Sequence, residues 1–115
     1  MKAKTIYVDE ISTTSGGEVE YTVPNNTRAK LVFLHIEHNE GSGNKDVEIY
    51  VNDGSTDHHI IHAKSVSVGD DVVFDVSQTS YLMLEASHSI KAEASGSGCQ
   101  LILTVEETQH LMVTP

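Results

Sequence analysis

The chain alternates short β-favouring runs with turn residues. Glu18 to Val23 and Asp46 to Val51 alternate polar and apolar positions, which is the period of a half-buried strand. Lys30 to His38 begins as a continuous apolar run, which suits a strand covered on both faces. Asp53-Gly54, between two such runs, is a strong hairpin signal because this pair accepts the positive φ of a tight turn. These features predict a fold made of strands.

Reading the whole chain in this way predicts about nine strands at a spacing of roughly 8–12 residues. No segment keeps the 3.6-residue period of a helix over about 11 residues. The sequence therefore predicts an all-β chain: a single antiparallel β-sandwich, of the jelly-roll or immunoglobulin-like type, with about 8–9 short strands and no substantial helix. The further predicted strands are Thr5 to Val8, His59 to Val68, Val72 to Val76, Tyr81 to Ala86, Ser89 to Ala94 and Cys99 to Val105.

The 115 residues are expected to form one domain, since chains split into domains only at greater lengths. The first residues are expected to be an unstructured lead-in to the strand at Thr5 to Val8. Glu106 to Pro115 shows no clear period. We therefore assign residues 1–108 to the sandwich and residues 109–115 to a C-terminal arm or a frayed tail.

The alternation also sorts strand residues by face. The residues expected to face the core are Val47, Ile49, Val51, Val72, Phe74, Val76, Leu82, Leu84, Ile90, Ala92, Leu101, Leu103 and Val105. Those expected to face outward are Glu48, Tyr50, Asp75, Tyr81, Met83, Glu85, Lys91, Glu93, Gln100 and Thr104.

The charge balance bears on the choice of partner. Seventeen acidic residues against seven basic ones give a net charge of −10 with neutral histidines. This charge argues against nucleic acid and against an anionic membrane surface as partners, because both attract Lys and Arg. The opening MKAKTIYVDE lacks the apolar core of a signal peptide, and no run approaches the roughly 18 apolar residues of a membrane helix. We expect a chain made without a signal peptide.

Histidine is the unusual feature of the composition. On a strand, His58 and His62 would stand about 13 Å apart, so they are not expected to share an ion unless the chain turns. His35 and His38 fall on opposite faces of their strand, although a cross-strand pair of His35 with His62 stays open. The first expectation for His58, His59 and His62 is a surface or subunit contact. A metal site and a pH-sensitive surface are the alternatives, the latter because histidine titrates near neutral pH.

Other residues offer little chemistry. Asp53 to Asp57 and Gly69 to Asp71 could give oxygen ligands to calcium, but tight turns need the same residue types. The lone Cys99 has no partner for an internal disulfide and is expected to be buried and inert. No Gly-x-Ser-x-Gly elbow occurs, and no glycine turn leads into a helix that could cradle a phosphate. The chain is expected to be no enzyme and to need no cofactor.

Between Asp46 and Glu107 the chain resembles the small β-sandwich domains of tailed-phage virions. The resemblance rests on four segments, which combine turn chemistry with alternation. They are the hairpin segment from Val47 to Ser55, the turn segment from Val66 to Phe74, the run from Leu82 to Ala86, and the run from Ile90 to Gly98 that continues into Leu101 to Glu106.

The resemblance implies a non-enzymatic virion protein, and most directly a capsid decoration (cement) subunit that stabilises the phage head. Its partners would be the major capsid protein or other virion proteins, it would form a homo-oligomer, with a trimer favoured, and it would reside in the virion after assembly in the host cytoplasm. The alternatives are a head–tail joining, tail or receptor-binding tip protein, or, in another class, a calcium- or carbohydrate-binding module. The expected assembly contacts are Met1, Lys2, Ala3, Lys4, Thr5, Ile6, Tyr7, Leu111, Met112 and Val113.

Overall fold

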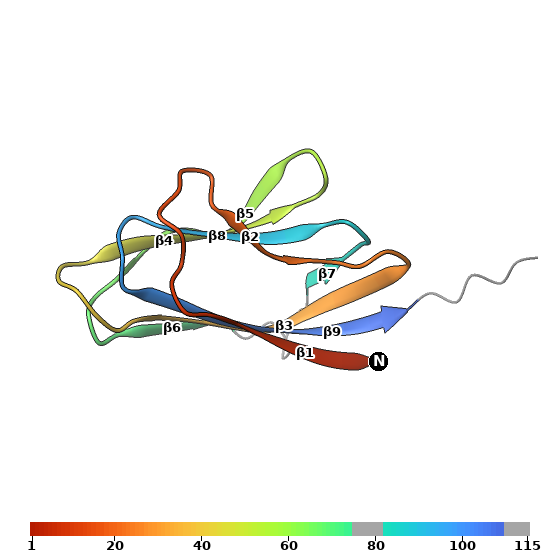
Figure 1. Ribbon diagram of the computed structural model, residues 1–115, viewed down its shortest axis with the longest axis horizontal. Coiled ribbons are helices and arrows are strands. Elements are labelled where there is room, and N and C mark those ends of the chain that lie inside the picture. Colours follow the sequence, from red (N-terminus) through yellow and green to blue (C-terminus); the bar gives the residue numbers. More distant parts are fainter. Residues whose placement is uncertain (75–81, 110–115) are drawn as a thin grey trace, which may run out of the picture.

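A computed structural model describes residues 1–74 and 82–109 of the chain. These residues form two facing layers of strands (Figure 1). No helix long and apolar enough to cross a membrane occurs in the described ranges. The strands are β1 Lys2–Val8, β2 Glu18–Thr22, β3 Thr27–His38, β4 Lys45–Asn52, β5 Asp57–Val66, β6 Asp71–Phe74, β7 Leu82–Leu84, β8 Ser89–Ala94 and β9 Cys99–Gln109.

The two layers are separate antiparallel sheets. Sheet A has the order β1-β9-β3-β6, with β7 also paired to β3, and sheet B has the order β2-β8-β4-β5. Sheet B lies above sheet A in the view of Figure 1, and the loop between β1 and β2 crosses from one layer to the other. The predicted single antiparallel β-sandwich is confirmed, and every predicted run that the structure describes overlaps a strand.

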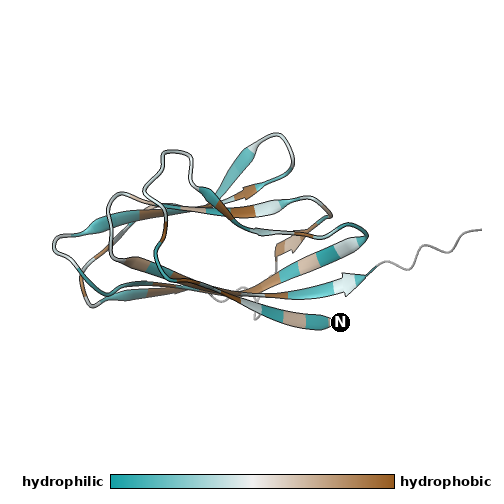
Figure 2. Cartoon of the chain, in the orientation of Figure 1, coloured by the Kyte–Doolittle hydropathy of each residue, from teal (hydrophilic) through white to brown (hydrophobic). Residues whose placement is uncertain are grey.

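The core fills the space between the sheets, as the alternation requires. Leu31, Leu34 and Ile36 of β3 are fully buried and belong to one core cluster with Val47 and Ile49 of sheet B. Hydrophobic segments accordingly occur in both layers (Figure 2). Each strand thus gives one face to the core and leaves the other for contacts outside it.

The strands at both ends of the chain are longer than predicted. The first residues are not an unstructured lead-in, because β1 begins at Lys2 and pairs with β9 from Lys2↔Glu107 to Val8↔Leu101. At the other end, β9 continues through Gln109, so residues 106–109 belong to a strand. Glu106 and Glu107 interrupt the alternation of apolar and polar residues that identifies a strand in the sequence. Glu107 points inward, where its carboxylate accepts a hydrogen bond from the Tyr21 hydroxyl at 2.6 Å. Leu111, Met112 and Val113 lie outside the described residues.

Candidate functional site

Irregular pairing between β4 and β5 brings two histidines to one face of sheet B. Tyr50 pairs with His59 and Ile49 pairs with Ile61, so one extra residue of β5 lies between these two partners. In a regular strand, positions three apart point to opposite faces, but an inserted residue reverses the parity. His59 and His62 therefore both point outward. A second register shift follows next to Ala63, whose φ is +49°.

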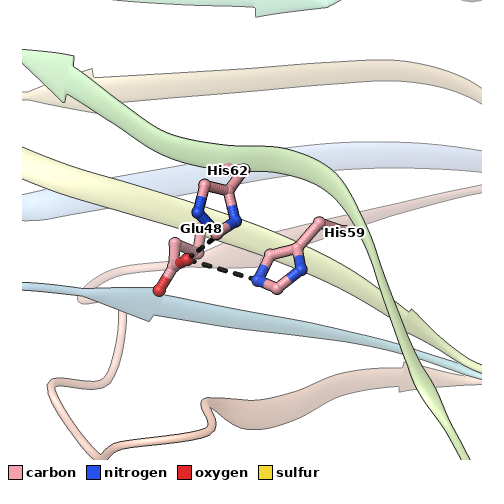
Figure 3. Close-up of side chains that lie close together, drawn as sticks. All are labelled: Glu48, His59 and His62. Carbon is pink, nitrogen blue, oxygen red and sulfur yellow. Dashed lines mark ion pairs between the residues drawn. The ribbon is translucent and has the colours of Figure 1, made fainter.

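The carboxylate of Glu48, on β4, contacts both rings from one side (Figure 3). Its Oε1 atom lies 3.2 Å from Nε2 of His59 and 3.4 Å from Nδ1 of His62. The two imidazoles meet edge to face, with ring centroids 4.4 Å apart. The side chain of His62 is 70% exposed and that of Glu48 only 23% exposed, so the cluster opens to solvent on the histidine side. We call these three residues the Glu48 cluster.

Tyr50 anchors the cluster from beside it. Its hydroxyl lies 2.7 Å from Oε1 of Glu93 and 3.2 Å from Oε2 of Glu48, and its ring packs 4.5 Å from that of His59. Burial raises the pKa of the Tyr50 phenol, and the hydrogen bond and negative charge of Glu93 raise it further. The phenol thus remains a hydrogen-bond donor between two carboxylates.

The β1–β2 loop covers Tyr50, which explains why a side chain on the outer face is only 6% exposed. The backbone N–H of Gly16 donates to Oε1 of Glu93 at 3.0 Å. Gly17 lies so close to the sheet that a Cβ there would stand 2.9 Å from the carbonyl oxygen of Ala92 and 3.3 Å from the Tyr50 ring. The outward direction predicted for Tyr50 is correct, but the sequence did not show this cover.

His58 is held apart from its two neighbours. Its Nε2 pairs with Oδ2 of Asp53 at 2.9 Å, on the hairpin between β4 and β5. That contact and the backbone N–H groups of Thr56 and Ser55 hold the pKa of the Asp53 carboxyl well below its usual range. Asp57 is likewise engaged, by Asn52 and by Lys91. The aspartates of this hairpin thus stabilise their own turn and the adjacent strands, and the calcium alternative gains no support here.

The two histidines of β3, His35 and His38, lie on opposite faces of the strand, as predicted. His35 points outward and pairs with Asp71 at 3.0 Å, whereas His38 is fully buried. His38 is the register partner of the buried Cys99, and its Nδ1 lies 3.2 Å from the carbonyl oxygen of Val66. Since a carbonyl can only accept, this contact makes Nδ1 the protonated nitrogen. Burial raises the pKa of the Cys99 thiol, which suits the inert role expected of it.

The outer face of sheet A carries apolar side chains on several neighbouring strands. The register aligns Tyr7, Ile102, His35 and Val73 across four strands. Tyr7 is 72% exposed and Val73 is 55% exposed. Phe33, one row away, stacks beside His35 with a centroid distance of 6.3 Å. We call this row, together with Phe33, the sheet A face.

The predicted site residues thus fall on separate surfaces. Six of the predicted assembly contacts, Lys2 to Tyr7, form most of β1 at the edge of sheet A. Of the predicted pH-sensitive group, His59 and His62 join Glu48, while His58 joins Asp53, and pH sensitivity stays a prediction. The sequence alone did not indicate Glu48 as their partner. The alternation did place Glu48 on the outer face of the sheet. Its contact with both histidines depends on the extra residue in β5, which the sequence does not reveal.

Comparison with known proteins bears on the fold. No protein-family model matches the chain, and no curated protein matches it. A solved structure described as "Bacillus endospore appendages form a novel family of disulfide-linked pili" is similar to it, with a TM-score of 0.55 and 11% sequence identity. The similarity covers 96% of this chain and 88% of that one. At this identity the comparison supports the β-sandwich architecture alone.

Proposed function

We propose that this chain is a non-enzymatic structural subunit of a virion, and specifically a decoration subunit that stabilises a tailed-phage head. The sheet A face is the observation that carries the proposal. Tyr7 and Val73 expose apolar surface at the two ends of its row, with half-buried Ile102 and His35 between them, and an exposed apolar patch typically marks a protein-binding surface. The proposed partner is the major capsid protein, contacted by a homo-oligomer that is favoured to be a trimer.

Strand β1 supports the proposal from the edge of the same sheet. An edge strand presents backbone N–H and C=O groups that can pair with a strand of another chain. Tyr7 lies on this edge strand and in the apolar row, so one partner could contact both features. Lys4 of β1 points inward, and its Nζ lies 5.7 Å from the centre of the Tyr21 ring, so this edge strand carries a charge on its inner side. Inward-pointing charge of this kind limits indiscriminate edge pairing.

The other sheet gives the contrast. The outer face of sheet B carries Glu48, Glu93 and Lys91, and its buried Tyr50 is already covered by the chain's own loop. We therefore propose that sheet A faces the partner and sheet B faces solvent. Cys99 is buried, so the association proposed here is non-covalent.

Immunogold electron microscopy on particles purified from the source tests this proposal. An antibody against the chain should label the whole head at high copy number, because a decoration subunit binds at repeated positions of the shell. Label at a single vertex or on the tail would overturn decoration in favour of a joining or tail protein. Absence of label on the particles would overturn the virion proposal itself.

A further inference from the structure

We propose that the Glu48 cluster is a binding site for one zinc ion, on the face of sheet B opposite to the proposed assembly surface. This site is independent of the proposed virion role. Two imidazole nitrogens and one carboxylate oxygen form a donor set that zinc takes in proteins, usually with a water or another ligand in the fourth position. None of the three side chains is needed by the hydrophobic core.

The distances agree with such a site. Donor atoms around tetrahedral zinc are about 3.3 Å apart, because each lies about 2.0–2.1 Å from the ion. The two observed separations from Oε1 of Glu48 are 3.2 Å and 3.4 Å. All three donor atoms lie within 4.8 Å of one another. The side chain of His62 is 70% exposed, so its ring can adjust its position toward an ion at little cost.

The surrounding charge favours a cation. Glu48 and Glu93 are directly opposite each other in the β4–β8 register, and like charges in that position repel. One phenol, Tyr50, lies within hydrogen-bond distance of both carboxylates, and it can donate only one hydrogen. Lys91, two residues before Glu93 on β8, is paired with Asp57, and its Nζ lies 5.8 Å from the centre of the Tyr50 ring. A dication at the cluster would offset the repulsion between the two glutamates.

The groups behind the ligands hold them in place. Oε2 of Glu48 faces the Tyr50 hydroxyl, which leaves Oε1 for the histidine side. The Tyr50 ring supports that of His59, and Tyr50 is itself fixed under the β1–β2 loop. Such outer contacts fix the orientation of metal ligands and contribute to affinity. Nitrogen donors also select zinc over magnesium and calcium, which prefer oxygen.

Isothermal titration calorimetry of the tag-free chain with zinc chloride tests the site. We expect one zinc ion per chain and no binding of magnesium or calcium chloride under the same conditions. His62→Ala should weaken zinc binding at least about tenfold, and Glu48→Gln should weaken it similarly while keeping the shape of the side chain. The matched control is His58→Ala, which also removes an exposed histidine paired with a carboxylate but should leave zinc affinity unchanged.

Imidazole nitrogen NMR separates this site from weak binding to any surface histidine. On zinc addition, Nε2 of His59 and Nδ1 of His62 should shift, and the His58 nitrogens should not. Thermal melts without metal establish that all variants remain folded. Equal zinc affinity in the wild type and in His62→Ala, or an equal loss in His58→Ala, would overturn the assignment.

Discussion

Replacing Val73 with glutamate is expected to reduce binding to the particle at least about tenfold. Val73 ends the exposed row that crosses sheet A from Tyr7. Val73 is 55% exposed, so a partner seated on it gains roughly half of the 1.5–3 kcal/mol of full burial, about 0.8–1.6 kcal/mol, and about 1.4 kcal/mol corresponds to a factor of ten in affinity. A carboxylate in the same contact would also lose its hydration without gaining a partner. Co-sedimentation of the Val73→Glu variant with particles from which the native chain has been removed measures the loss of binding.

Val19→Glu is the matched control for that experiment. Val19 is 54% exposed against 55% for Val73, but it lies on β2 of sheet B, opposite Lys91. The two variants carry the same change in charge and lose the same exposed side chain. Particle binding by Val19→Glu should equal that of the wild type. Equal binding losses in both variants would mean that net charge, and not the sheet A face, governs attachment.

Replacing Gly98 with alanine is expected to destabilise the fold by about 3 kcal/mol or more. Gly98 has a φ of +102°, where side chains are rarely accommodated, and an added Cβ would overlap the backbone carbonyl of Glu40. The carbonyl of Gly98 accepts a hydrogen bond from the N–H of Asn39 at 3.0 Å. This bond ties the β8–β9 loop to the β3–β4 loop, so the two loops cannot move apart to admit a methyl group without breaking it. Urea denaturation at neutral pH measures the loss.

Gly43→Ala measures the backbone part of this effect alone, so the difference between the two variants gives the steric part. Gly43 also has a positive φ, +77°, but an added Cβ there would meet no atom within 4 Å. The free energy of unfolding of this variant should fall by only about 1–2 kcal/mol, the cost of placing alanine in the left-handed backbone conformation. Equal destabilisation by the two substitutions would show that the packing of Gly98 against the Glu40 loop contributes nothing to stability.

The fold could be predicted from the sequence because its strands alternate so regularly. In β4, the inward positions Val47 and Ile49 and the outward Glu48 fall where the alternation puts them. The prediction was wrong at the ends, where inward-facing charged or polar side chains obscure the period. Lys4 and Glu107 both face inward there, and each is accommodated by Tyr21.

The Glu48 cluster could not be predicted, since it depends on an irregularity that has no clear signal in one sequence. The strand spacing correctly separates His58 from His62. The sequence does not show that one extra residue in β5 brings His59 and His62 to the same face. The cover over Tyr50 depends likewise on the path of the β1–β2 loop, which the polar run from Ser12 to Gly17 leaves undetermined.

Hydrogen–deuterium exchange on the chain, alone and bound to particles, tests most directly the claim that sheet A is the assembly surface. Peptides covering β1 and β6 should exchange more slowly in the bound chain, because a partner seated on Tyr7 and Val73 protects the backbone beneath. Peptides covering β5, which carries the histidines of the Glu48 cluster, should exchange at the same rate in both states. Protection of β5 with unchanged exchange in β1 and β6 would contradict the account.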